Sequence, residues 1–167
     1  MADLLRDTSC SYLDLEFPNC HVRPGANISV ALSYNNLPNV QVSLFRVDPV
    51  KMVEEGIPLT APRIPRGATP FKTWTENLPW GRDVDLQIPA LQPGSYLVNV
   101  SSDLFSRNTL VFVTDLMGST QTDGRILLGQ ISGHSSKHDV TVLVQKKHSL
   151  IYKGKASQHR IFAAATK

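Results

Sequence analysis

The sequence of 167 residues has few cysteines, few charged residues and no long apolar run. Charged side chains make up 19% of it, against about 25% in an average globular protein. Lys and Arg are scattered rather than gathered in a stripe with interleaved aromatic residues, so we expect no nucleic-acid partner. No apolar run approaches the ~20 residues that span a bilayer, which argues against a direct transmembrane segment.

The first residues also lack the apolar core of a signal peptide. Two interpretations follow: a cytosolic protein, or a piece cut from a longer chain. Met1-Ala2 stands before an unrelated start, and we favour the second interpretation.

The two cysteines, Cys10 and Cys20, flank a segment that alternates polar and apolar residues, Tyr12–Phe17. Such alternation is typical of a strand. Six strand residues span about 20 Å, whereas the Cα atoms of a disulfide lie within about 7 Å of one another. We therefore expect a free, partly buried pair of thiols; a disulfide would require a hairpin here instead.

Short alternating segments between turn residues are what the sequence does contain. In Ile88–Val100, Pro93 and Gly94 suit a turn, and a strand pattern follows from Ser95 onward. Similar spacing recurs along the chain and predicts an all-β fold, an antiparallel β-sandwich of the fibronectin or immunoglobulin type. The predicted strands are Tyr12–Phe17, Asn27–Tyr34, Val40–Val47, Asp83–Ile88, Ser95–Ser102 and Arg107–Thr114.

One short helix is predicted in the middle of the chain. Asp48 can cap its N-terminus, Pro49 suits the first helical position, and Gly56 can end it.

The segment 56–80 is rich in proline, which interrupts regular structure. We expect an irregular connection laid over the sandwich and anchored by Phe71, Trp74 and Trp80. Trp74 and Trp80 are also the residue type that stacks on a sugar face, which gives a second interpretation. We favour anchoring over ligand stacking, and a plain loop over a polyproline ligand at Pro62-Arg-Ile-Pro65.

Beyond residue 116 four more strands are predicted. We place one sandwich domain at 10–116, and at 117–167 additional strands that form part of a second β domain or a small one. The four strands are Gly124–Ile131, Val140–Gln145, Ser149–Tyr152 and Ile161–Ala164.

Candidate chemistry in the sequence is weak. His134 and His138 are the best metal candidates, but their spacing presents two ligands together only on a helix, and the segment is loop-like. The sequence contains no nucleophile elbow, no phosphate-binding glycine loop and no calcium loop. We therefore expect a protein that is not an enzyme and holds no cofactor.

Several sequence motifs together resemble those of a known family. Leu44-Phe-Arg-Val-Asp48, Leu91-Gln-Pro-Gly-Ser-Tyr-Leu-Val98 and Val113-Thr-Asp-Leu116 occur in this order. The order resembles a macroglobulin-like domain of bacterial alpha-macroglobulin-family proteins, over roughly residues 12–116. The thioester hallmark of that family, Cys-Gly-Glu-Gln, is absent from the sequence.

The resemblance implies a non-catalytic structural domain of a large protease-trapping inhibitor. It implies sister domains of the same chain as partners, proteases as targets of the parent protein, and a periplasmic, cell-surface or secreted location. The alternative from another class is a carbohydrate-binding or adhesive sandwich of a cell-surface protein, which would use Trp74 and Trp80.

Overall fold

A computed structural model describes residues 10–16, 21–80, 83–115, 117–122, 126–132, 140–146, 149–156 and 161–165. Beyond residue 115 it describes the course of the strands but not their side chains. The chain divides into two compact units. Unit 1 consists of Met1–Val47 and Ala61–Val113, and unit 2 of Asp48–Thr60 and Thr114–Lys167.

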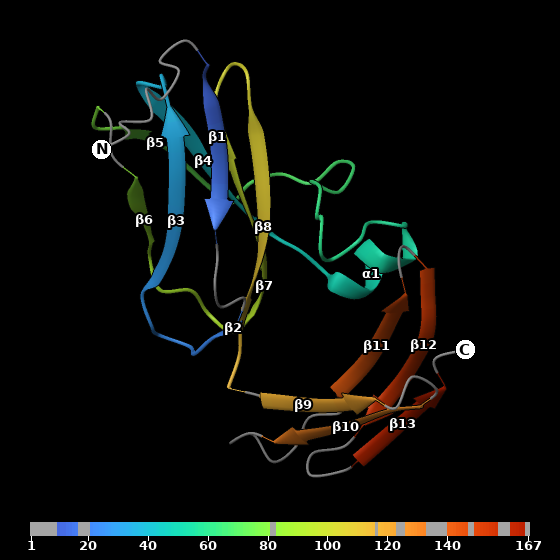
Figure 1. Ribbon diagram of the computed structural model, residues 1–167. Helices are drawn as coiled ribbons and strands as arrows, with labels where there is room; N and C mark the ends of the chain where they lie inside the picture. Colours follow the sequence, from blue (N-terminus) through green and yellow to red (C-terminus); the bar gives the residue numbers. More distant parts are fainter. Residues whose placement is uncertain are drawn as a thin grey trace, which may run out of the picture. The chain divides into compact units, whose positions relative to one another are not determined.

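Unit 1 contains two β-sheets (Figure 1). The smaller is antiparallel, with the order β1 (Tyr12–Glu16), β3 (Ile28–Asn35), β6 (Val84–Ile88). The larger has the order β2 (His21–Val22), β8 (Ser106–Val113), β7 (Gly94–Ser101), β4 (Asn39–Arg46), β5 (Lys72–Asn77). It is antiparallel apart from the short pairing of β2 with β8.

One apolar core joins the two sheets of unit 1. Leu13, Val30, Leu32 and Leu86 from the smaller sheet belong to the same buried cluster as side chains of the larger sheet such as Val42. These side chains are fully or almost fully buried because alternate strand residues point to one face. The predicted antiparallel β-sandwich is thus confirmed.

The turn before β7 is tied to its own strand. The Tyr96 hydroxyl donates to the carbonyl oxygen of Gln92, at 2.8 Å, and the ring is buried in the core. This is the arrangement known as a tyrosine corner in β-sandwiches, in which a strand tyrosine bonds to the backbone a few residues upstream. The segment Leu91-Gln-Pro-Gly-Ser-Tyr96 therefore has a structural role, which is to hold the turn that leads into β7.

Helix α1 (Pro49–Glu54) confirms the predicted helix. The Asp48 carboxylate accepts from the backbone N–H of Val50 at 2.9 Å and of Lys51 at 3.4 Å, as an N-cap does. Gly56 has a φ of 72°, a left-handed conformation that glycine adopts without strain. Met52 and Val53 are buried.

In the described residues of unit 2 the chain forms five strands and α1. Figure 1 labels these elements. Four strands overlap the predicted ones: β10 (Ile126–Ser132), β11 (Val140–Lys146), β12 (Ser149–Ala156) and β13 (Ile161–Ala165). Of these, β12 ends four residues beyond the predicted strand Ser149–Tyr152. A fifth, β9 (Met117–Thr122), pairs with β10 and was not predicted. Its sequence, Met-Gly-Ser-Thr-Gln-Thr, lacks the apolar alternation that marks a half-buried strand.

The structure corrects the expectations for the segment 56–80 and for Cys10. The segment 56–80 is not irregular throughout, because its second part forms β5, which pairs with β4 over six residues. Pro70 and Pro79 lie outside this strand, so neither removes one of its hydrogen bonds. Cys10 is a free thiol, as expected, but it is exposed rather than partly buried. Cys20 lies outside the described residues.

No helix in the described part of the chain is both long and apolar enough to cross a membrane.

Candidate functional site

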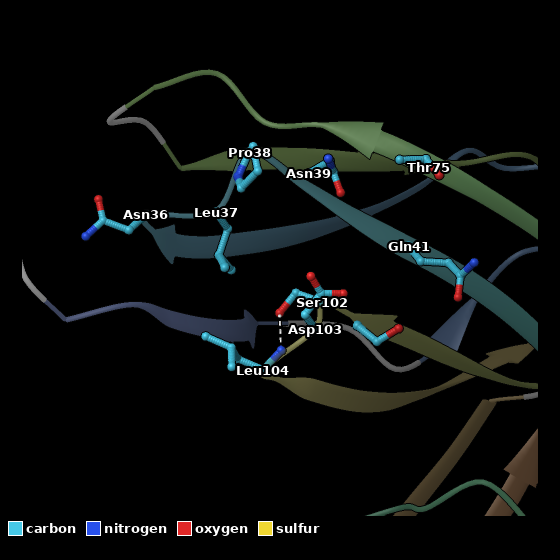
Figure 2. Close-up of a pocket in the computed structure, with 10 residues that line it drawn as sticks. Asn36, Leu37, Pro38, Asn39, Gln41, Thr75, Ser102, Asp103 and Leu104 are labelled. Carbon is cyan, nitrogen blue, oxygen red and sulfur yellow. Dashed lines mark hydrogen bonds between the residues drawn. The ribbon is translucent and has the colours of Figure 1, made fainter.

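An open cleft of about 690 Å³ lies at one end of unit 1 (Figure 2). On one side stands the β3–β4 connection, with Leu37 and Pro38, and on the other the β7–β8 turn, with Ser102–Leu104. The residues that line it are Asn36, Leu37, Pro38, Asn39, Gln41, Thr75, Ser101, Ser102, Asp103 and Leu104.

The floor of the cleft is a row of polar side chains across three strands. Gln41 on β4 pairs with Thr75 on β5 and with Ser101 on β7, so the three side chains share one face of the larger sheet. This is the face away from the core, since Val40 and Val42, on either side of Gln41, point inward. Among the described residues, none donates to or accepts from these three side chains.

The next polar row along the same face is bonded within itself. The hydroxyls of Ser43 and Thr73 lie 3.2 Å apart, and the amide nitrogen of Asn99 donates to Asn108 Oδ1 at 2.9 Å and to Ser106 Oγ at 2.8 Å. Ser43 and Asn99 are buried, so these bonds satisfy polar groups that water does not reach. The two rows therefore differ: the row that contains the buried Ser43 and Asn99 is bonded within itself, and the cleft floor leaves its hydrogen-bonding groups open.

The rim on the β7–β8 side is held by the backbone. Ser102 N–H donates to the Phe105 carbonyl oxygen at 2.8 Å, and Ser102 Oγ accepts from the N–H of Leu104 and of Phe105. On the opposite rim Asn36 has a φ of 53°, a left-handed conformation in which asparagine is enriched. The backbone at both rims of the cleft is therefore held in one conformation by the turn that it forms.

The chemistry available in the cleft is hydrogen bonding plus one carboxylate. Of its lining residues only Asp103 is ionisable, and it is exposed. The lining holds no cation that would bind a phosphate, and no histidine or cysteine near a base that would act as a nucleophile. Within the described part of the chain, no group of three or more His, Cys, Asp or Glu is placed to hold a metal ion.

The structure gives the two tryptophans different surroundings. Trp74, on β5, is half-buried and packs against the core, and Lys72 Nζ lies 5.5 Å from the centre of its ring. Trp80 follows β5 and is 88% exposed, so it does not anchor the connection as expected. Phe71 is 53% exposed and makes a tilted ring contact with Tyr96. Neither tryptophan lines the cleft.

The metal candidates His134 and His138 lie outside the described residues. The sequence does not predict the cleft, because the floor of the cleft is formed by three segments that lie far apart in sequence. The available signal was the exposed polar positions of predicted strands, Gln41 and Ser101, next to turn residues such as Asp103. Only the strand register brings them together.

Comparison with known proteins gives matches among solved structures alone. No protein-family model matches the chain, and no curated protein matches it. A native alpha-2-macroglobulin fragment from Escherichia coli, spanning the domains MG0-NIE-MG1, matches 93% of this chain with a TM-score of 0.60 at 17% identity. The chain spans 58% of that fragment.

Two further structures agree. The NIE-MG1 fragment of the Escherichia coli protein matches 93% of the chain, which spans 88% of it, with a TM-score of 0.55 at 16% identity. A Salmonella alpha-2-macroglobulin mutant matches 92% of the chain with a TM-score of 0.56 at 14% identity, and the chain spans 10% of it. At these identities the likeness shows the fold. The chain has a macroglobulin-like fold, as the resemblance in its sequence implied.

Proposed function

We propose that this chain is a non-catalytic structural region of a protease-trapping protein of the alpha-macroglobulin type. The observation that carries the proposal is the extent of the match. It covers 92% or more of the chain in three bacterial alpha-2-macroglobulin structures, so it includes most of unit 2 as well as unit 1. A match limited to one sandwich would carry less weight, since β-sandwiches serve many functions.

The chemistry of the described residues supports a role without catalysis. The cleft presents amides, hydroxyls and one exposed carboxylate, which can bind but which lack a paired base or an activated nucleophile. The remaining polar side chains on the same face hydrogen-bond to side chains of neighbouring strands and so stabilise the sheet. The role that remains is to fold stably and to present surfaces to neighbours.

On this proposal the partners are sister domains of the same polypeptide, and proteases are targets of the whole parent protein. The domain layout proposed is a macroglobulin-like sandwich at 10–116 and, at 117–167, part of a second β domain or a small one. The order of domains in the matched fragments, MG0 before NIE-MG1, supports a further domain ahead of this chain in the parent. The proposed location is the periplasm, the cell surface or the extracellular space.

A carbohydrate-binding or adhesive module remains the alternative, because Trp80 presents an 88% exposed ring. Trp74 contributes less to such a surface, since it packs against the core. A glycan array separates the two proposals. Binding that Trp80→Ala abolishes, and that Phe71→Ala leaves intact, would favour the alternative.

The proposal is tested by sequencing the reading frame that encodes this chain in its source. We expect the frame to extend into further macroglobulin-like domains and a Cys-Gly-Glu-Gln thioester motif or its remnant. A frame that encodes these two units alone would overturn the proposal.

A further inference from the structure

Exposed large apolar side chains lie in loops and at a strand end at one end of unit 1. Of the described residues, the two most exposed large apolar side chains are Trp80, at 88%, and Leu104, at 73%. Tyr12, at 39%, belongs to the same end. Several exposed apolar side chains at the same end of a domain mark an interaction site more often than a single one does.

The strand register places these residues at the same end of unit 1. Tyr12, the first residue of β1, pairs with Asn35, the last residue of β3. The β3–β4 connection follows at once, and the N–H of Leu78 donates to the Pro38 carbonyl oxygen at 2.9 Å. Trp80 therefore stands two residues beyond the rim of the cleft. Leu104 lies on the opposite rim, in the turn after Ser101.

This end of unit 1 is also held in place. The Tyr34 hydroxyl donates to the carbonyl oxygen of Pro79, next to Trp80, and the Asn35 amide donates to the Cys10 carbonyl oxygen at 2.8 Å. The turn that carries Leu104 is closed by the Ser102–Phe105 bonds. A surface that is already ordered loses little conformational entropy when a partner binds.

We propose that this end of unit 1, defined by Tyr12, Asn36–Asn39, Pro79–Trp80 and Ser102–Leu104, docks against the domain that precedes this chain in the parent polypeptide. The inference rests on the proposed function. The occupant is a preceding domain because β1 begins here, so any polypeptide ahead of residue 10 joins unit 1 at this end. A tethered neighbour has a high effective concentration at the surface nearest its linker.

The chemistry of the surface describes the partner. Trp80 and Leu104 require an apolar pocket or patch, since buried aromatic anchors contribute most of the binding energy at interfaces. The cleft at this end offers amides, hydroxyls and the Asp103 carboxylate, and its lining holds no cation. The partner therefore presents uncharged hydrogen-bonding groups or a Lys or Arg side chain to the cleft, and no phosphate or cluster of carboxylates.

Thiol labelling of the full-length parent protein tests the proposal. In a background where Cys10 and Cys20 are serine, Leu104→Cys and Ile64→Cys each place one reporter thiol at an exposed apolar position of this chain. Mass spectrometry of the peptide that carries the reporter measures its labelling separately from that of other cysteines in the parent. Ile64 lies outside the proposed surface and serves as the matched control. We expect maleimide to label the Leu104→Cys protein about tenfold more slowly than the Ile64→Cys protein, because the docked domain must open first.

The aromatic anchor is tested on the same reporter. Adding Trp80→Ala to the Leu104→Cys protein should restore fast labelling, whereas Phe71→Ala, which removes another exposed ring, should leave it slow. Equal rates at the two reporter positions would overturn the inference, while the proposed function would still stand on the reading frame. Slow labelling that disappears on dilution, with a dimer in light scattering, would assign the surface to a second copy and also overturn it.

Discussion

Two tyrosine hydroxyls of unit 1 each hydrogen-bond a loop to the sandwich. Tyr96 bonds to Gln92 at the turn that enters β7, and Tyr34 bonds to Pro79 in the loop that follows β5. Both rings are buried, at 4% and 6% exposure, and each hydroxyl has a backbone carbonyl oxygen as its acceptor. Buried tyrosines are favourable in such positions because the ring adds apolar contact while the polar tip keeps a partner.

Tyr96→Phe should lower the free energy of unfolding by about 1 kcal/mol, the usual net worth of one such hydrogen bond. The loss has two parts: the bond itself, and the Gln92 carbonyl oxygen left without this donor. Urea denaturation of the 167-residue chain measures it. Tyr12→Phe, at a 39% exposed ring, is the control and should change the stability by less than half as much.

Tyr34 should make the stability of unit 1 depend on pH in the alkaline range. Burial raises the pKa of the Tyr34 hydroxyl above its ordinary value of 10.0, and the nearby Asp83 carboxylate raises it further. The folded state therefore holds this proton more tightly than the unfolded chain does. The stabilisation is complete below about pH 10 and falls as pH rises through the folded pKa.

Urea denaturation between pH 9 and pH 11 measures this dependence. Tyr34→Phe should flatten the slope over that range while it lowers stability at neutral pH, because the bond to Pro79 is lost. Asp83→Asn should reduce the slope by a smaller amount, since Asp83 is the second cause of the shift. An unchanged slope in Tyr34→Phe would assign the alkaline response to other groups.

At the scale of elements, β5 shows how a free sheet edge is kept from pairing with other chains. It is the outer strand of the larger sheet, and Lys72 and Glu76 pair with the core residues Leu44 and Val40. Opposite residues of an antiparallel pair share a face, so both charges stand on the core side of the edge strand. Inward-pointing charges of this kind discourage the addition of another strand.

Replacing both charges, Lys72→Val with Glu76→Val, should promote self-association, because the strand would become a flat apolar edge flanked by β-branched residues. Light scattering of the chain at rising concentration measures it. Thr75→Val on the outer face of the same strand is the control and should leave the chain in its original oligomeric state. Unchanged scattering in the double variant would show that the charges do not guard the edge.

The N-cap of α1, Asp48, is a second local feature that stabilises the chain. Asp48→Ala should destabilise the protein by about 1 kcal/mol, as the loss of an N-cap usually does. Asp48→Asn keeps an oxygen acceptor for the N–H of Val50 and should recover most of that loss. Thermal unfolding followed by far-ultraviolet circular dichroism compares the two variants.

The sequence predicted elements where its pattern alone determines local structure. Six of the eight strands described in unit 1 and the capped helix follow from alternation, Pro93-Gly94 and Asp48-Pro49, and each of their boundaries falls within about two residues, as is usual for assignments of this kind. β2 was missed because two residues are too few to show a periodic pattern. β5 was missed because five prolines dominate the segment 56–80, although Lys72–Asn77 lies between two of them. β9 was missed because its small polar residues carry no periodic signal.

The cleft could not be predicted from the sequence for a different reason. Gln41, Thr75 and Ser101 are ordinary exposed strand residues when each is considered alone. They form one floor only because β4 pairs with both β5 and β7 in this register. The exposure of Trp80 could not be predicted from the sequence either. An aromatic residue in a loop can pack on the core or point into solvent, and tertiary packing decides which.

At the scale of the whole chain, the role that we propose is that of a scaffold that presents surfaces to neighbouring domains. The core of unit 1 is built from alternating Val, Leu and Ile, and its polar side chains serve the sheet or the cleft. On the proposed function, such a region contributes rigidity and docking surfaces to a parent protein of many domains, and we expect the inhibitory chemistry elsewhere in that polypeptide.

Protease trapping by the full-length parent protein tests this central claim most directly. The parent is incubated with an excess of an endopeptidase, and residual activity is measured on a large protein substrate and on a short peptide substrate. We expect the parent to suppress cleavage of the protein substrate and to spare cleavage of the peptide, while the 167-residue chain alone does neither. A parent that leaves both activities unchanged, or an isolated chain that itself inhibits or hydrolyses, would contradict the claim.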